Sequence, residues 1–135
     1  MQTTEIEDRI KIHDLFVRYT LAVDTWDEPA LLGCFTDDGV LETPVLGGRF
    51  AGRNGQREFL RVGRSRAEGQ TRHVFSNLGV QVDGARATAQ SYFVVYATRS
   101  PGHALAAVGR YNCRLRKVGD EWLFEYRGVS IDGRE

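Results

Sequence analysis

Four extended segments follow one another without interruption in the second half of the chain. They are rich in Val, Tyr, Phe and Thr, which favour strands, and they comprise residues 71–82, 86–99, 104–118 and 122–131. Short runs of turn-forming residues separate them: Asp83-Gly84, Ser100-Pro101-Gly102 and Gly119-Asp120. Because such short turns join strands that run in opposite directions, this half of the chain predicts an antiparallel meander.

The first half of the chain has a helical pattern instead. It predicts a helix from about Glu5 to Asp24 and a short helix that starts around Glu28-Pro29. Three further elements follow: a turn with a short strand at residues 35–42, a tight return at residues 47–52, and a third helix that Asn54 caps and that ends near Ser65. Helices followed by a meander predict an α+β domain, with the helices on one face of a curved sheet and a ligand cavity between them.

Length, charge and cysteine content narrow the class of protein. The chain of 135 residues and 15.2 kDa fits one domain, residues 1–135. Its 18 basic residues balance 18 acidic ones, which argues against nucleic acid or an anionic membrane as the main partner.

No apolar run is long enough to span a bilayer, and the acidic N-terminal segment has no signal-peptide pattern, so we expect a cytoplasmic protein. Cys34 and Cys113 lack the spacing of a zinc site, and we expect buried thiols and no metal.

Asp24 is the first residue that the helical pattern does not explain. At about 100° per residue, the first helix has an apolar stripe made of Ile6, Ile10 and Val17, and Phe16 flanks this stripe. Asp24 projects in the direction of the same stripe. A carboxylate there is costly unless it is paired or hydrogen-bonded. Asp24 therefore either has a buried partner or ends the helix and faces water.

His73 is the second polar residue in an apolar context. It opens an extended segment in which alternation places Phe75 and Asn77 on the same face as His73. The opposite face carries apolar side chains: Val74, Leu78 and Val80. His73 is therefore either a polar group of a pocket or a solvent-facing histidine of an edge strand. For His13, on the Asp24 side of the first helix, we expect a core histidine rather than a pocket residue.

The last predicted strand carries an arginine among apolar neighbours. Arg127 shares its face with Leu123 and Val129. One interpretation is an inward cation that holds a carboxylate or a developing oxyanion. The other is an ion pair with Glu125 or Asp132 at the rim of the sheet.

Four stretches of the sequence resemble a known family. They are YTLAVDTWDEPALLGCFTDDGVLE (residues 19–42), GQREFL (55–60), TRHVFSNLGVQVDGARATAQSYFVVY (71–96) and GRYNCRLRKVGDEWLFEYRGV (109–129). Together they resemble the SnoaL-like branch of the nuclear transport factor 2-like (NTF2-like) superfamily over nearly the whole chain. Within that branch, the arrangement is similar to scytalone dehydratase, bile acid 7-alpha-dehydratase and hexachlorocyclohexane dehydrochlorinase.

The resemblance implies functional roles for particular residues. The Asp of a Tyr-x4-Asp-x2-Asp pattern is Asp24, and Tyr19 is its tyrosine. His73 completes an Arg-His step, and Arg127 follows a Trp-x-Phe strand. The catalytic candidates are thus Asp24, His73, Tyr19 and Arg127, although the Tyr19 hydroxyl either reaches a pocket edge or caps the core. The substrate-binding candidates are Phe16, Asn77, Tyr92, Tyr96 and Tyr111.

The same resemblance implies a cone-shaped α+β barrel, in which a mainly antiparallel sheet and three N-terminal helices close a central cavity. It also implies an oligomer and no cofactor. The strands themselves favour a homodimer or homotrimer, because residues 86–118 carry apolar side chains on both faces of the sheet. Seven arginines within residues 49–72 predict a solvated outer surface, with an anionic partner or a pocket lid as the alternative.

The chemistry expected of these residues is proton abstraction. A histidine beside a buried carboxylate is held in one tautomer and gains basicity from the negative charge. The sequence has no nucleophile elbow, HExxH, Walker-type loop or GxGxxG, which disfavours covalent, metal and nucleotide chemistry. We therefore predict a cofactor-independent lyase, a dehydratase that acts on a small cyclic or polyketide-like carbonyl compound. The alternatives are an isomerase or polyketide cyclase with the same Asp-His base, or a noncatalytic module that binds a small hydrophobic or aromatic molecule.

Overall fold

The computed structural model describes residues 3–134. Its helices and strands are, in order, α1 (Thr3–Thr25), α2 (Glu28–Leu32), β1 (Phe35–Thr43), β2 (Gly48–Ala51), α3 (Gly52–Arg66), β3 (Gln70–Asp83), β4 (Arg86–Arg99), β5 (Gly102–Val118) and β6 (Glu121–Ile131). The predicted α+β class and the four-stranded meander are confirmed. The third helix begins earlier than predicted, because Ala51 occupies its N-cap and Asn54 lies inside the first turn.

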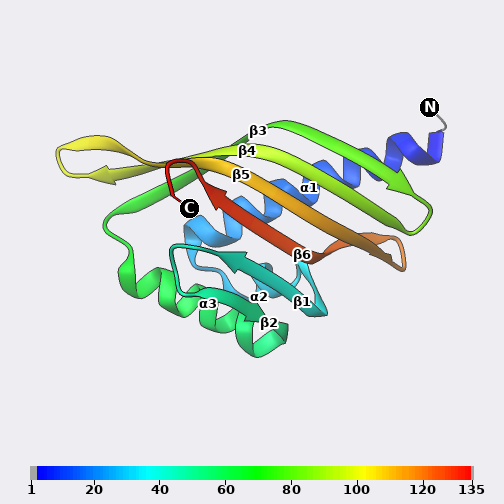
Figure 1. Cartoon of the computed structure of the whole chain (residues 1–135), viewed down its shortest axis with the longest axis horizontal. Coiled ribbons are helices and arrows are strands. Elements are labelled where there is room, and N and C mark those ends of the chain that lie inside the picture. Colours follow the sequence, from blue (N-terminus) through cyan, green and yellow to red (C-terminus); the bar gives the residue numbers. More distant parts are fainter. Residues whose placement is uncertain (1–2, 135) are drawn as a thin grey trace.

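All six strands form one sheet, in the order β2-β1-β6-β5-β4-β3. Every neighbouring pair is antiparallel except β1 and β6, which run parallel. Figure 1 shows the sheet curving around α1, with α2 and α3 beside β1 and β2. Because β2 and β3 lie at the two ends of the strand order, the sheet stays open and the predicted barrel is not closed by strand pairing.

The core lies between α1 and the concave face of the sheet. Ile12, Phe16 and Tyr19 of α1 are buried there, together with Trp122 and Phe124 of β6. The predicted apolar stripe of α1 was wrong. Ile6 and Ile10 are 45% and 57% exposed, since the helix carries apolar residues on two sides and the sheet covers only one of them.

A β-bulge in β3 changes which residues face the core. The register shifts between Ser76 and Gly79, and Asn77 adopts a left-handed backbone conformation with φ of 54°. After the bulge, Leu78 and Val80 pack against the core on the same side as Phe75, and Asn77 is exposed. The predicted alternation is therefore correct up to Ser76 and wrong beyond it.

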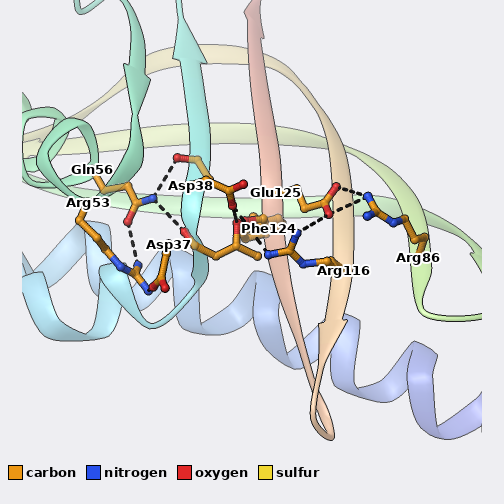
Figure 2. Close-up of polar contacts among 10 residues, drawn as sticks. Asp37, Asp38, Arg53, Gln56, Arg86, Arg116, Phe124 and Glu125 are labelled. Carbon is orange, nitrogen blue, oxygen red and sulfur yellow. Dashed lines mark hydrogen bonds and ion pairs between the residues drawn. The ribbon is translucent and has the colours of Figure 1, made fainter.

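A second bulge lies in β6 and determines where Arg127 points. Leu115 pairs with Phe124 and Arg114 pairs with Tyr126, which leaves Glu125 as the extra residue. Phe124 and Arg127 consequently both face the core. Figure 2 shows the Glu125 carboxylate between two arginines of neighbouring strands.

Ion pairs and hydrogen bonds stabilise this region of the sheet. The Glu125 carboxylate accepts from Arg86 Nη1 at 2.7 Å and lies 3.3 Å from Arg116 Nη1. Nearby, buried Gln56 of α3 donates to the Gly39 carbonyl at 2.9 Å, and Arg53 pairs with Asp37 at 2.9 Å (Figure 2). These contacts fix α3 against β1 and hold the bulge in place.

Candidate active site

Asp24 and His73 are in direct contact. Asp24 lies in the last turn of α1 and is 6% exposed, and its Oδ1 atom is 2.6 Å from Nδ1 of His73. The same carboxylate accepts the backbone N–H of His73 at 2.9 Å and the hydroxyl of Thr71 at 3.1 Å. Of the two sequence-based interpretations of Asp24, the buried and paired one is therefore correct.

The environment of Asp24 keeps its carboxyl group ionised. Burial raises the pKa, but hydrogen bonds from the side chain and backbone of His73, the charge of His73 and the Thr71 hydroxyl outweigh it. The resulting pKa of Asp24 is below its ordinary value. An ionised carboxylate at Oδ1 favours the tautomer of His73 with the proton on Nδ1, which leaves the lone pair on Nε2.

His73 opens into a cavity of about 330 Å³ between α1, α3 and strands β3 to β5. Its walls are largely apolar and include Trp26, Leu46, Phe59, Val95 and Ala97. The His73 side chain is 17% exposed, so its ring is reachable from this cavity. A larger hollow of about 500 Å³ lies on the opposite, solvent-facing side of the sheet, away from this pair.

Arg127 is fully buried and has no carboxylate partner within residues 3–134. Its guanidinium carbon lies 3.7 Å from the ring centre of Tyr111 and 3.9 Å from that of Tyr19, and the rings of Phe16 and Phe124 are also within 5 Å. Its Nη1 atom contacts the Cys113 sulfur at 3.5 Å, whereas Nε and Nη2 lack hydrogen-bond partners.

The predicted alternative of an ion pair between Arg127 and Glu125 or Asp132 at the rim of the sheet is wrong. Glu125 faces Arg86 and Arg116 instead.

The groups around Arg127 do not neutralise its charge. Burial raises the pKa of Tyr19 and of Tyr111, and the positive charge of Arg127 only partly opposes this effect. Both phenols therefore stay protonated at neutral pH. The guanidinium consequently lies in a low-dielectric site with aromatic faces as its main partners.

The structure does not bring all the predicted residues together. Phe16, Tyr19 and Tyr111 surround Arg127 rather than line the cavity beside His73. Tyr92 and Tyr96 are 54% and 48% exposed on the far face of β4, so neither lies beside His73.

The positions of two further residues also differ from expectation. Asn77 is exposed in the β3 bulge and borders a separate hollow on the outer face. His13 is exposed too, with only one edge of its ring against Phe75, so the expected core histidine was wrong.

Sequence reasoning missed several residues of the site, among them Thr71 and Trp26. Thr71 lies two positions before His73, so strand alternation places both on one face, and this spacing was an available signal. Trp26 follows Asp24 closely but has φ of 57°, a conformation that bulky residues rarely adopt and that no pattern indicated. Its indole forms part of the cavity wall.

Within residues 3–134, no helix is long and apolar enough to cross a membrane. Over the same range, no three His, Cys, Asp or Glu side chains gather in a way that could hold a metal ion. The comparison with family profiles finds a match to the SnoaL-like domain over residues 4–128. The chain belongs to this family.

Solved structures share the fold of this chain. Rv3472, a protein of unknown function from Mycobacterium tuberculosis, has 34% identity and a TM-score of 0.84, with 97% of this chain and 78% of that chain covered. An NTF2-like protein with a cystatin-like fold from Novosphingobium aromaticivorans has 25% identity and a TM-score of 0.87, with 97% and 86% covered.

A third structure has a name that refers to an activity. It is provisionally named a scytalone dehydratase, comes from Novosphingobium aromaticivorans, and has 21% identity and a TM-score of 0.82, with 97% of this chain and 88% of that chain covered. At this identity the likeness concerns the fold. No curated protein matches the chain.

Proposed function

We propose that this SnoaL-like domain is a cofactor-independent lyase that removes a proton from the carbon next to a carbonyl group and expels water. The observation that carries this proposal is the 2.6 Å contact between Asp24 and a His73 ring that opens into an apolar cavity. The resemblance of the fold to a protein provisionally named scytalone dehydratase supports the same reaction class. In this proposal the substrate is a small cyclic or polyketide-like carbonyl compound, and the largely apolar walls support this choice.

His73 is the base in this proposal. Nε2 takes the proton from carbon, the electrons of that C–H bond form the new double bond, and the hydroxyl group leaves with the electrons of its C–O bond. The imidazolium then returns the proton to the departing oxygen, so that water is released and His73 is neutral again. Asp24 holds the ring in the required tautomer and stabilises the imidazolium.

Arg127 has an electrostatic role in this proposal. Its charge has no counter-ion in the described chain, and it lies among aromatic side chains rather than on the cavity wall. In a low-dielectric core, this charge stabilises negative charge that develops on the carbonyl oxygen. Tyr19 supports it by packing against the guanidinium.

One observation favours an isomerase or cyclase as the second candidate. Among residues 3–134, the one carboxylate on the cavity wall is Glu68, which is paired with Arg99 at 3.0 Å, so His73 alone would have to protonate a leaving group. In an isomerase or cyclase, the same base moves a proton without elimination. Product analysis by mass spectrometry separates the two reactions, because a dehydratase product is lighter by one water.

The experiment that tests the lyase proposal uses a panel of cyclic β-hydroxyketones and follows the absorbance of the conjugated enone. We expect the wild type to form enone and His73→Gln to lose activity by about 10² or more, because glutamine keeps hydrogen bonding but not basicity. His103→Gln is the matched control, since His103 is exposed and bonded to Thr98 at 3.0 Å. Enone formation that survives His73→Gln would contradict the proposal.

A further inference from the structure

Three ionic side chains, Arg66, Glu68 and Arg99, line the cavity beside His73. Arg66 ends α3, Glu68 lies in the link between α3 and β3, and Arg99 ends β4. Arg99 Nη2 is 3.0 Å from the Glu68 carboxylate, and its Nε donates to the Glu68 carbonyl at 3.4 Å. Because this pair neutralises itself, Arg66 determines the net charge of the rim.

Arg66 has no carboxylate partner within the described residues. Its Nη1 donates to the Val45 carbonyl at 3.3 Å, a bond that holds the guanidinium at the cavity mouth and leaves its other donors free. Arg53, Arg57 and Arg61 of the same helix each face a carboxylate, and Arg64, which has none within the described residues, does not line the cavity. Arg66 is therefore a positioned but uncompensated cation.

The rest of the cavity suits an apolar ring. Trp26 holds its indole against the wall in spite of an unfavourable positive φ. Gly63 lies beside this indole, since a Cβ at that position would be in ordinary contact with it at 3.4 Å. Phe59 and Val95 add to the apolar lining of the cavity.

The two ends of the cavity differ in electrostatic character. The ionised carboxylate of Asp24 lies at the His73 end, where it disfavours a second anion, while Arg66 attracts one at the mouth. A guanidinium binds a carboxylate through two parallel hydrogen bonds, which fixes orientation as well as adding affinity.

We infer that the ligand of this cavity is an apolar, ring-containing molecule with one anionic group, which Arg66 binds at the mouth while the ring lies against Trp26. This inference rests on the proposed function in one respect: the bound orientation brings the carbon that loses its proton to His73. The substrate class is then an organic acid, or a derivative of it that keeps an anionic group.

The test compares two probes that share a ring system and differ in charge. They are 1-anilinonaphthalene-8-sulfonate, which is anionic, and N-phenyl-1-naphthylamine, which is neutral. Binding is followed by probe fluorescence and by quenching of Trp26, the tryptophan on the cavity wall; the second tryptophan, Trp122, is buried elsewhere against Asp8. We expect the anionic probe to bind the wild type about tenfold more tightly, as for one charge-assisted contact.

The variants separate the contribution of Arg66 from general charge effects. Arg66→Gln should reduce the affinity for the anionic probe to that for the neutral one and leave the neutral probe unchanged. Arg64→Gln removes the same charge from the same helix turn but does not touch the cavity, and should change neither affinity. Ala106→Phe fills the cavity and should weaken both probes.

Several results would overturn the inference. They are equal affinities of the two probes for the wild type, equal losses in Arg64→Gln and Arg66→Gln, or anionic-probe binding that survives Ala106→Phe. Neither probe is turned over, so this test measures binding to the cavity alone. Failure of the lyase proposal would therefore leave this result intact, and failure of the probe test would leave the base chemistry untouched.

Discussion

Both carboxylate oxygens of Asp24 contact His73, because Oδ1 lies 2.6 Å from Nδ1 and Oδ2 accepts the backbone N–H at 2.9 Å. One side chain at the end of α1 thus fixes the backbone of β3 and the ring that β3 carries. The position of the ring does not depend on a flexible loop. This arrangement couples the stability of the helix–strand junction to the ionisation of Asp24.

The first prediction concerns stability at acidic pH. Because the pKa of Asp24 is lower in the folded than in the unfolded chain, its ionisation favours folding. The contribution is complete above the unfolded-state pKa of about 3.9 and is lost as the pH falls through the lower folded-state pKa. The difference in unfolding free energy between wild type and Asp24→Asn should therefore shrink below about pH 4.

Urea unfolding from pH 3 to pH 7 measures this difference. Asp14→Asn is the control, because Asp14 is exposed on α1 and the substitution should change the unfolding free energy by less than about 0.5 kcal/mol. A wild type and an Asp24→Asn variant that lose stability in parallel below pH 4 would show that Asp24 carries no such contribution.

The second prediction separates function from stability at Arg127. Replacing this buried, unpaired cation by methionine removes a desolvation cost but also removes contacts with four aromatic rings. We expect Arg127→Met to leave the unfolding free energy unchanged or raise it by about 1 kcal/mol. Activity should fall by about 10², because the charge that stabilises the oxyanion is lost.

Enone formation and urea unfolding together test this prediction, with Arg110→Met, an exposed site on the outer face, as the control. Strong destabilisation together with full activity per folded molecule is the outcome that would assign Arg127 a structural role only.

The third prediction tests the β3 bulge. Asn77 has φ of 54°, which asparagine and glycine tolerate and β-branched residues do not. Asn77→Val should therefore cost about 1–2 kcal/mol of stability, whereas Asn77→Gly should be nearly neutral. Neither variant should change binding of the two naphthalene probes, because Asn77 lies away from the cavity; thermal unfolding and fluorescence titration measure both effects. Altered probe binding in Asn77→Gly would show that the bulge shapes the cavity.

The fourth prediction concerns assembly. Tyr92 and Tyr96 are about half exposed on the outer face of β4, and apolar surface of this kind favours burial against another copy of the chain. We expect a dimer or trimer by light scattering at micromolar concentration and a monomer for Tyr96→Glu. Ile10→Glu, at an exposed apolar position on α1, is the control and should keep the wild-type mass. A monomeric wild type would refute this prediction.

The strands and the Asp24–His73 contact were predictable from sequence for physical reasons. Alternating β-branched and aromatic residues between Gly-containing turns specify a meander locally. Asp24 and His73 each stand out as polar groups in apolar stretches, and the family resemblance pairs them. The strand and turn signals act over short distances along the chain, whereas Asp24 and His73 are 49 positions apart and were paired by the resemblance.

The positions beyond the two bulges were not predictable in the same way. Alternation fails after one inserted residue, so Asn77 and Arg127 lie on the opposite faces from those that a regular strand gives them. The buried side of α1 was also ambiguous, because Ile6 and Ile10 offered an apolar stripe that the sheet does not cover. Contacts with the rest of the fold, rather than the local sequence pattern, determine which side of α1 is buried and on which face of the sheet Asn77 and Arg127 lie.

The most direct measurement of the central claim is deuterium exchange at the carbon next to the carbonyl of a cyclic ketone that lacks a leaving group. The reaction in D₂O requires only a base, so it isolates proton removal by His73 from elimination. We predict that wild type and His103→Gln catalyse exchange and that His73→Gln is slower by about 10² or more. Exchange at the wild-type rate in His73→Gln would contradict the assignment of His73 as the base.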